Sequence, residues 1–333
     1  MPTMPRILIA AALAVSLLTG CGGSSDDAAP TGAAGGNVRL VAYSTPREAY
    51  AKLIDLYTSA AGAGVSFDQS YGSSGEQSRA VEAGLRADVV AFSLEPDMQR
   101  LVEPGLVPAG WNAGEHKGMV TDSVVVFIVR EGNPKAIESW DDLTKPGVEV
   151  LTPNPFTSGG ARWNVMAAYG AQLEQGKSEE QARDYLRSLF ENVVVQDKSA
   201  RESLTTFASG KGDVLLGYEN EAIFAERQGQ PVEHVVPDQT ILIENPVAAT
   251  KDASAAGKGF VEFLWSDEAQ RIFGDEGYRP VVESVAASFD FPQPPSLFTI
   301  ADVGGWETVQ TEFFDRVEGF MAEVQRELGQ PTE

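Results

Sequence analysis

Short apolar runs alternate with amphipathic helical patterns along most of this chain. Runs of apolar, often β-branched residues predict strands. These runs are 40–43, 65–69, 87–92, 124–129, 148–151, 193–196, 214–218 and 240–243. Long helices are predicted over 178–190, 259–273 and 305–328, with a proline-rich irregular segment at 289–295. The alternation predicts an α/β fold in which mainly parallel sheets are flanked by helices.

Five of the predicted strands end in small, polar or tyrosyl residues at the start of a helix. Three of these junctions have the spacing of a capping box, at 45–48, 73–76 and 199–202. A fourth contains Ser158-Gly159-Gly160, and the fifth is Tyr218-Glu219-Asn220. The first N–H groups of a helix have no partner within it, and its dipole favours an anion there. Glycines allow a ligand to approach these donors closely.

These junctions are expected to meet in one place. The carboxyl ends of strands in open α/β sheets border a crevice where ligands bind. Serine, glycine, alanine and tyrosine offer backbone N–H and hydroxyl donors there, which suits a small, fully ionised oxyanion. The plain alternative for each serine is a helix cap that contributes about 1 kcal/mol. The hypothesis of a site therefore depends on the coincidence of several junctions.

Charge limits the possible partners. The formal net charge of the 333 residues is −23 at pH 7. Such a chain disfavours nucleic acid and anionic membranes. Local donors must therefore hold any bound anion against a repulsive overall field.

The amino-terminal residues predict export and a lipid anchor. An apolar run, 7–18, follows Arg6 and is too short to span a bilayer, so 1–20 are interpreted as a signal peptide. Leu18-Thr19-Gly20-Cys21 matches the bacterial lipobox, and Cys21 is the single cysteine. An ordinary secretory signal with an incidental cysteine is the alternative. Residues 21–36 are rich in Gly, Ser and Ala and predict a flexible tether.

The rest of the chain is long enough for two lobes. Lobe 1 is predicted to comprise 37–120 and 241–333, and lobe 2 to comprise 121–240. Whether the C-terminal helix packs on lobe 1 or on lobe 2 is left open. His116 and His234 stand far apart, and no nucleophile elbow or P-loop occurs, so no metal, cofactor or catalytic group is expected.

Around these junctions, from 38 to 306, the chain resembles the bacterial sulfate-binding proteins, the substrate-binding lipoproteins of sulfate/thiosulfate ABC transporters. The most specific segments are Thr152-Pro153-Asn154-Pro155, 158–164, Gly212-Asp213-Val214-Leu215 and Glu219-Asn220-Glu221-Ala222. The resemblance implies a two-lobed periplasmic-binding-protein fold of type II that closes over dehydrated sulfate in the cleft between its lobes.

The resemblance also implies the residues that bind sulfate. A serine hydroxyl, backbone N–H groups and one aromatic side chain hold the anion in that family. The corresponding positions here are Ser44, Ser74, Ser158, Gly159, Gly160, Ala200 and Tyr218. Ser44 replaces a common aspartate, where the family uses a backbone donor. Tyr218 replaces a tryptophan, and its hydroxyl can accept as well as donate a hydrogen bond.

The function implied is a monomeric receptor, anchored to the cell membrane through Cys21, that delivers sulfate to the permease subunits of an ABC transporter. It faces the periplasm or the extracellular side and is not an enzyme. Thiosulfate and molybdate or tungstate are alternative ligands, and an anchored ester hydrolase is the alternative from another class. Near the expected site, Arg162 and Arg201 could reach the ligand or change the local potential. Pairing with acids such as Glu202 or Glu219 is the favoured interpretation, and Trp163 is expected to pack in the core.

Overall fold

The structure is a computed structural model that describes residues 36–61 and 64–332. The predicted signal peptide, Cys21 and all but the last residue of the tether lie outside these residues. No helix in the described ranges is long and apolar enough to cross a membrane.

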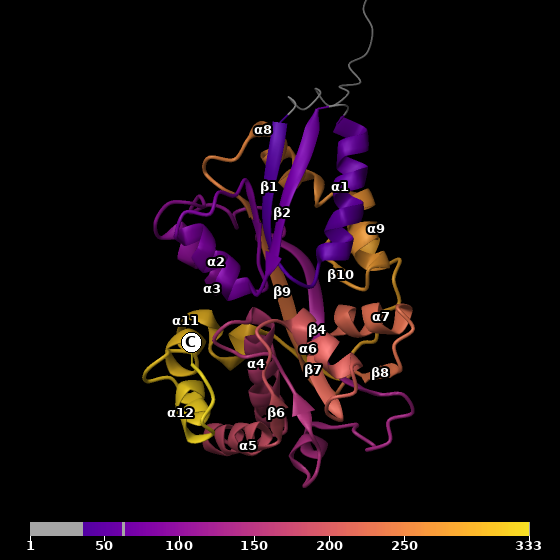
Figure 1. Cartoon of the computed structure of the whole chain (residues 1–333), viewed down its shortest axis with the longest axis vertical. Helices are drawn as coiled ribbons and strands as arrows, with labels where there is room; N and C mark the ends of the chain where they lie inside the picture. The colour runs from indigo at the N-terminus through magenta and orange to yellow at the C-terminus, as the bar shows by residue number, and fades with distance from the viewer. Residues whose placement is uncertain (1–35, 62–63, 333) are drawn as a thin grey trace, which may run out of the picture. The chain divides into compact units, whose positions relative to one another are not determined.

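The first lobe is built on three parallel strands flanked by helices (Figure 1). Strands β1 (Gly36–Tyr43), β2 (Val65–Gly72) and β3 (Val89–Ala91) pair in the order β2-β1-β3. The helices that follow them are α1 (Arg47–Ala61), α2 (Ser74–Glu82) and α3 (Glu95–Val102). Apolar residues of β1 and α1 form one core with Phe260 and Phe273 from the later helices α8 (Ala255–Phe263) and α9 (Asp267–Asp275).

The second lobe repeats this arrangement. Strands β5 (Val150–Leu151), β6 (Val193–Val195) and β7 (Val214–Tyr218) are parallel, and β5 lies in the middle. A 3-10 helix, η1 (Trp140–Thr144), precedes them, and β8 (Val232–Val235) follows them. The flanking helices are α4 (Gly159–Glu174), α5 (Glu179–Glu191), α6 (Ala200–Ala208) and α7 (Glu219–Arg227).

Two long antiparallel strands connect the lobes. The amino-terminal half of β4 (Met119–Arg130) pairs with β9 (Gln239–Ala249), and its other half pairs with β7 and β8. Strand β9 continues into the first lobe and pairs with β3. The α/β prediction is thus confirmed, with parallel strands in each lobe and antiparallel pairs where β4 and β9 pass from one lobe to the other. Residues 124–129 are buried on both faces, as predicted.

Two of the predicted long helices are wrong, because each is divided by side chains that bond to the backbone. Segment 259–273 contains parts of α8 and α9, and the Ser266 hydroxyl accepts the Ala269 N–H at the start of α9. Segment 305–328 forms α11 (Gly305–Glu312) and α12 (Phe320–Glu327). Between them, the Asp315 carboxylate accepts the N–H groups of Val317 and Glu318 at 2.9 Å.

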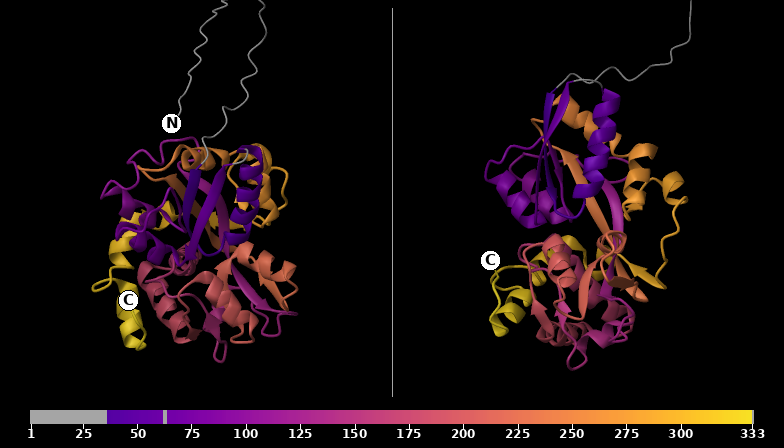
Figure 2. Two further views of the ribbon diagram at one scale, coloured as in Figure 1. Left: turned by 45° about the horizontal axis from the view of Figure 1, so that its top comes forward. Right: turned by 45° about the vertical axis from the view of Figure 1, so that its right-hand side comes forward.

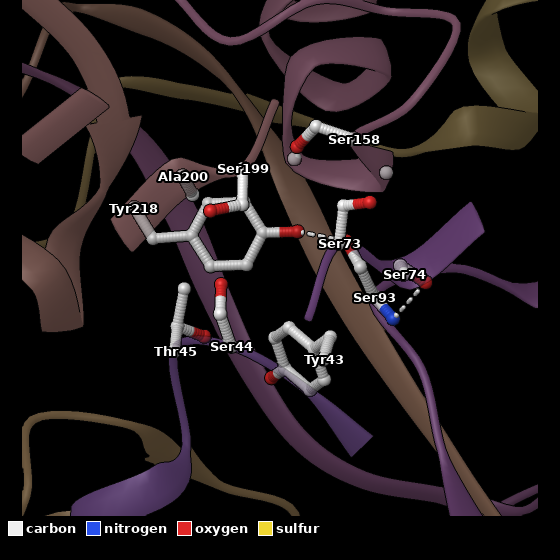
Figure 3. Close-up of a pocket in the computed structure, with 12 residues that line it drawn as sticks. Tyr43, Ser44, Thr45, Ser73, Ser74, Ser93, Ser158, Ser199, Ala200 and Tyr218 are labelled. Carbon is white, nitrogen blue, oxygen red and sulfur yellow. Dashed lines mark hydrogen bonds between the residues drawn. The ribbon is translucent and has the colours of Figure 1, made fainter. Parts of the chain in front are cut away.

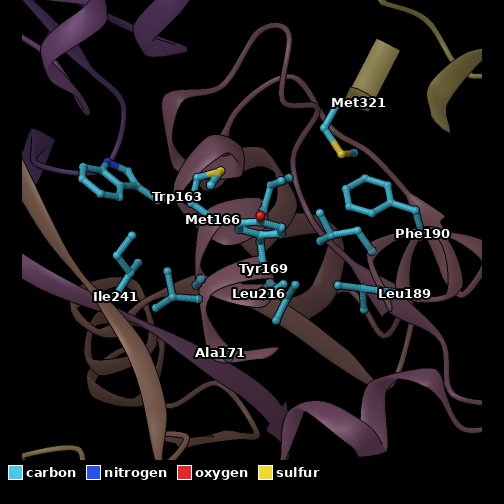
Figure 4. Close-up of a cluster of buried hydrophobic side chains, with 14 of the residues drawn as sticks. Trp163, Met166, Tyr169, Ala171, Leu189, Phe190, Leu216, Ile241 and Met321 are labelled. Atoms are coloured by element: carbon cyan, nitrogen blue, oxygen red, sulfur yellow. The ribbon is translucent and has the colours of Figure 1, made fainter. Parts of the chain in front are cut away.

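The C-terminal helices pack against the second lobe (Figure 2). The rings of Tyr169 on α4 and Phe313 lie 4.8 Å apart, and Met321 of α12 belongs to the same core (Figure 4). Arg183 of α5 binds Glu312 at 2.8 Å. Four short elements precede these helices: β10 (Arg279–Pro280), α10 (Glu283–Ala286), β11 (Ser296–Phe298) and η2 (Ile300–Val303). In the structure the segment after 304 is therefore part of the second lobe's core.

Charged residues face one another where β4 pairs with β9 and β10. Glu244 of β9, Asp122 of β4 and Arg279 of β10 stand opposite each other in register, so their side chains share one face of the sheet. Arg279 binds Glu219 through both carboxylate oxygens, at 2.8 and 3.0 Å. Burial, and then the charge of Glu244, raise the pKa of Asp122 to about 7, although Arg279 opposes the shift. Asp122 therefore holds a proton up to neutral pH in the folded protein.

This proton makes stability depend on pH. Unfolding returns Asp122 to a pKa near about 4, so the unfolded chain binds fewer protons between about pH 4 and 7. Asp122 therefore contributes a fall in the free energy of unfolding as the pH rises through this window. We expect Asp122→Asn to remove this part of the slope, a difference of roughly 2–4 kcal/mol between pH 4 and pH 8. Urea unfolding across this range measures it, and Asp184→Asn, an exposed acid on α5, is the control. Parallel profiles for Asp122→Asn and the wild type would contradict the expectation.

Candidate functional site

A small cavity lies between the two lobes. It is lined by twelve residues, and none of them carries a charged side chain (Figure 3). The lining residues are Tyr43, Ser44, Thr45, Ser73, Ser74, Ser93, Ser158, Gly159, Gly160, Ser199, Ala200 and Tyr218. All seven positions predicted from the sequence are among them, so the structure brings the predicted site residues together.

The cavity collects the starts of several helices. Helices α2, α4 and α6 begin there, with Ser73, Ser158 and Ser199 at their N-cap positions. Tyr218 stands at the N-cap position of α7. The first-turn N–H groups of Ser74, Gly159, Gly160 and Ala200 donate to no other group in the described part of the chain. Four free donors and the positive ends of the helix dipoles therefore line one small space.

The hydroxyl protons of the lining serines are used differently. Ser158 Oγ accepts the Ala161 N–H at 3.4 Å, and Ser199 Oγ accepts the Glu202 N–H at 3.3 Å. Both caps leave the hydroxyl proton free to donate into the cavity. The Ser74 hydroxyl instead donates to Asp97 at 2.6 Å and accepts the Ser93 N–H at 3.0 Å. Ser74 therefore offers the cavity only its backbone N–H.

Two of the three predicted capping boxes are wrong, and the third is half formed. The Ser73 hydroxyl donates to the Glu76 carboxylate at 2.7 Å instead of accepting a backbone N–H. Thr45 Oγ1 pairs with the Tyr278 hydroxyl at 3.1 Å, while Glu48 binds Arg201. At Ser199 the serine forms its cap, but the Glu202 carboxylate accepts the N–H of Lys198. The positions of the helix starts were still predicted closely.

Sequence reasoning missed Ser93, which lies immediately after the predicted strand 87–92. Its hydroxyl is 2.5 Å from the hydroxyl of Tyr218, which belongs to the second lobe (Figure 3). Its carbonyl accepts the Trp163 Nε1–H at 2.8 Å and an Asn245 N–H at 3.0 Å. The sequence feature that could have identified Ser93 is its position directly after a buried strand. The other missed lining residues adjoin predicted ones or lie at the same strand ends: Tyr43, Thr45, Ser73 and Ser199.

Tyr218 reaches the cavity as a neutral side chain. It is 1% exposed, and burial raises its pKa well above the usual value of a phenol. At neutral pH it can therefore donate its proton or accept one from Ser93.

The other aromatic and basic residues near the cavity have structural partners. Trp163 and Phe156 are fully buried in the core. Arg162 was expected to pair with an acid, and this is wrong, because its guanidinium donates to the Pro155 carbonyl and to Gln310. Burial lowers the pKa of Arg162 to about 10, so it stays charged at neutral pH. Arg201 does pair with acids, but with Glu48 and Glu221.

A family model for the bacterial extracellular solute-binding protein matches residues 38–279. The chain belongs to this family. A "Sulfate-binding protein" of Synechococcus elongatus is 41% identical over 94% of each chain. A "Thiosulfate-binding protein" of Pseudomonas aeruginosa is 37% identical over 76% of this chain and 81% of that protein. The solved structure of the sulfate-binding protein SubI from Mycobacterium tuberculosis H37Rv is 44% identical, with a TM-score of 0.81 over 84% of this chain and 99% of that one.

In this solute-binding protein, the two consecutive glycines at the start of α4, Gly159 and Gly160, have different surroundings. A Cβ added to Gly159 would lie 2.8 Å from Ser93 Cβ and would overlap Leu94, both of the first lobe. A Cβ added to Gly160 would lie 3.4 Å from Tyr218 Cε1, 3.5 Å from Ser158 Oγ and 3.6 Å from Ala200 Cβ. Those three residues line the cavity, so the space beside Gly160 belongs to the cavity itself.

Alanine should therefore act differently at the two positions. Gly160→Ala meets only ordinary contacts within a helix, where alanine is favoured over glycine by about 0.5–1 kcal/mol. We expect the free energy of unfolding to stay the same or to rise. Gly159→Ala should lower it by about 1–3 kcal/mol, because the methyl group overlaps the facing lobe. Urea unfolding of the two variants measures this, and equal losses would contradict it.

Proposed function

We propose that the protein is an extracytoplasmic receptor that binds sulfate in this cavity and delivers it to an ABC transporter. One observation carries the proposal: among the described residues, the cavity lining includes four residues whose backbone N–H groups have no protein acceptor, and it includes no charged side chain. Membership of a solute-binding family and similarity to proteins named for sulfate support it. The same membership argues against the anchored hydrolase, because the family is one of binding proteins and not of enzymes.

The chemistry of the cavity fits sulfate better than phosphate. Sulfate carries no proton at neutral pH, and every oxygen can accept a hydrogen bond. Phosphate carries at least one proton, and a site composed mostly of donors leaves it without a partner. A buried donor without an acceptor costs about 1–3 kcal/mol.

Each predicted residue has a proposed role. Ser158 would donate its hydroxyl proton, and Tyr218 would contribute its phenol. The remaining donors would be the backbone N–H groups of Ser44, Ser74, Gly159, Gly160 and Ala200. Donors from both lobes would then touch one ion, so sulfate would stabilise the closed arrangement of the lobes.

The test is calorimetry with sulfate, thiosulfate, molybdate, tungstate and phosphate at one pH. We expect sulfate to bind and phosphate to bind at least about tenfold more weakly, the equivalent of about 1.4 kcal/mol. Tighter binding of thiosulfate would favour that alternative, for which the similarity to a thiosulfate-binding protein is the specific observation. Phosphate as tight as sulfate would refute the proposal.

A pair of serine variants locates the site in the same experiment. Ser158→Ala removes a cap and a proposed donor, and should weaken sulfate binding by about 1.5–3 kcal/mol. Ser178→Ala removes the matching cap of α5, where Ser178 Oγ accepts the Gln181 N–H at 3.2 Å. It should cost stability but leave the affinity unchanged. Equal affinities for both variants would exclude Ser158 from the site.

We further propose that Cys21 carries a lipid that holds the receptor at the cell membrane, where it meets the permease subunits. The lipobox and the single cysteine support this, and both lie outside the described residues. Cys21→Ala should move the protein from the membrane fraction to the soluble exported fraction, because the acyl anchor is lost. Retention of the variant in the membrane fraction would contradict the anchor.

A further inference from the structure

Arg201 connects the two lobes beside the cavity without lining it. It is the second residue of α6 and follows Ala200. Its Nη1 and Nη2 donate to the two carboxylate oxygens of Glu48 at 2.9 and 3.0 Å. Nη2 also donates to the Thr45 carbonyl at 3.0 Å. Glu48 and Thr45 stand at the start of α1 in the first lobe.

The same guanidinium also binds an acid of its own lobe. Nε and Nη2 donate to the two oxygens of Glu221 on α7, at 2.9 and 2.8 Å. The Glu221 side chain is 2% exposed, and the ring of Phe224 lies 4.2 Å from the guanidinium carbon. Arg201 is thus held in place by α7 and presents its outer edge to the first lobe.

These contacts give the ion pair with Glu48 a particular energetic role. If the lobes separate, Arg201 loses Glu48 and Thr45 but keeps Glu221, so no charge is left buried without a partner. Only the arrangement in which the lobes touch contains the bonds from Arg201 to Glu48 and Thr45. A planar guanidinium suits this role, because it can hold two carboxylates in a fixed orientation.

We propose that Arg201 is a positioning residue that holds the Ser44–Thr45 segment of the first lobe against the start of α6 and slows the release of the bound anion. This inference rests on the proposed function. Ser44 and Ala200, the proposed donors, are the chain neighbours of Thr45 and Arg201. Arg201 therefore acts through backbone groups that line the cavity, and its own guanidinium is occupied by protein acceptors.

The decisive variant is Glu48→Gln, which weakens the bond between the lobes and leaves the buried Arg201–Glu221 pair intact. We expect the release rate of sulfate, measured by stopped-flow fluorescence, to rise about fivefold, while the association rate changes by less than about twofold. The matched control is Glu276→Gln. It removes the same charge and breaks an ion pair with Lys52 of α1 at 2.5 Å, but both partners belong to the first lobe. Its release rate should equal that of the wild type.

A second variant separates positioning from charge. Arg201→Lys keeps a positive charge beside Glu221 but loses the planar fork, so it should also speed release. The double variant Glu48→Gln/Arg201→Lys should release sulfate no faster than the faster single variant, because both changes weaken the same contact between Arg201 and Glu48.

The outcomes are distinguishable. Unchanged release in Glu48→Gln, or equal acceleration in Glu48→Gln and Glu276→Gln, overturns the role of Arg201 while sulfate binding stands. A wild-type protein that binds no sulfate refutes the proposed function and this inference together.

Discussion

The candidate site depends on backbone N–H groups that have no acceptor among residues 36–61 and 64–332. A buried N–H without an acceptor is costly, and folded proteins rarely keep one. Here four of them border a single cavity, at the first turns of three helices. An anion that fills the cavity would supply the missing acceptors. The N–H groups at these helix starts, which water or side chains usually satisfy, are therefore available to a ligand.

The absence of charge from the cavity lining is as important as the donors. The chain carries a net charge of −23, yet no carboxylate is among the lining residues. Asp97 and Glu76 come closest through hydrogen bonds, since they accept the hydroxyl protons of Ser74 and Ser73. Because of those bonds, the two serine hydroxyl protons are not available to a ligand. The bonds also fix the start of α2, whose residues line the cavity. The guanidinium groups of Arg162 and Arg201 do not donate into the cavity either, because they are bound to protein acceptors.

The sequence predicted the strand ends and helix starts around the cavity better than it predicted the long helices. Strand ends followed by serine and glycine have a local cause, the capping of a helix, so 158–160 and 199–200 could be found from short patterns. Ser93 was not predicted, because no capping box or glycine lies beside it in the sequence. It joins the site through the contact of its hydroxyl with the Tyr218 hydroxyl. The long helices at 259–273 and 305–328 were wrong because apolar spacing continues through Ser266 and Asp315, whose side chains bond to the backbone. The partner of Arg201 across the lobes, Glu48, lies more than 150 residues away, beyond any pattern in the chain.

The strands β4 and β9 are two of the chain's connections between the lobes. Because β4 and β9 run through both lobes, any separation of the lobes must move part of each strand with one lobe relative to the other. The cavity lies where Ser93 of one lobe meets Gly159 and Tyr218 of the other, and a Cβ at Gly159 would already be too large for that contact. Close contact between the lobes is thus permitted only by a residue without a side chain. The same glycine that carries one of the proposed donors also permits this close approach of the lobes, so the proposed ligand contact and the lobe contact depend on one position in the chain.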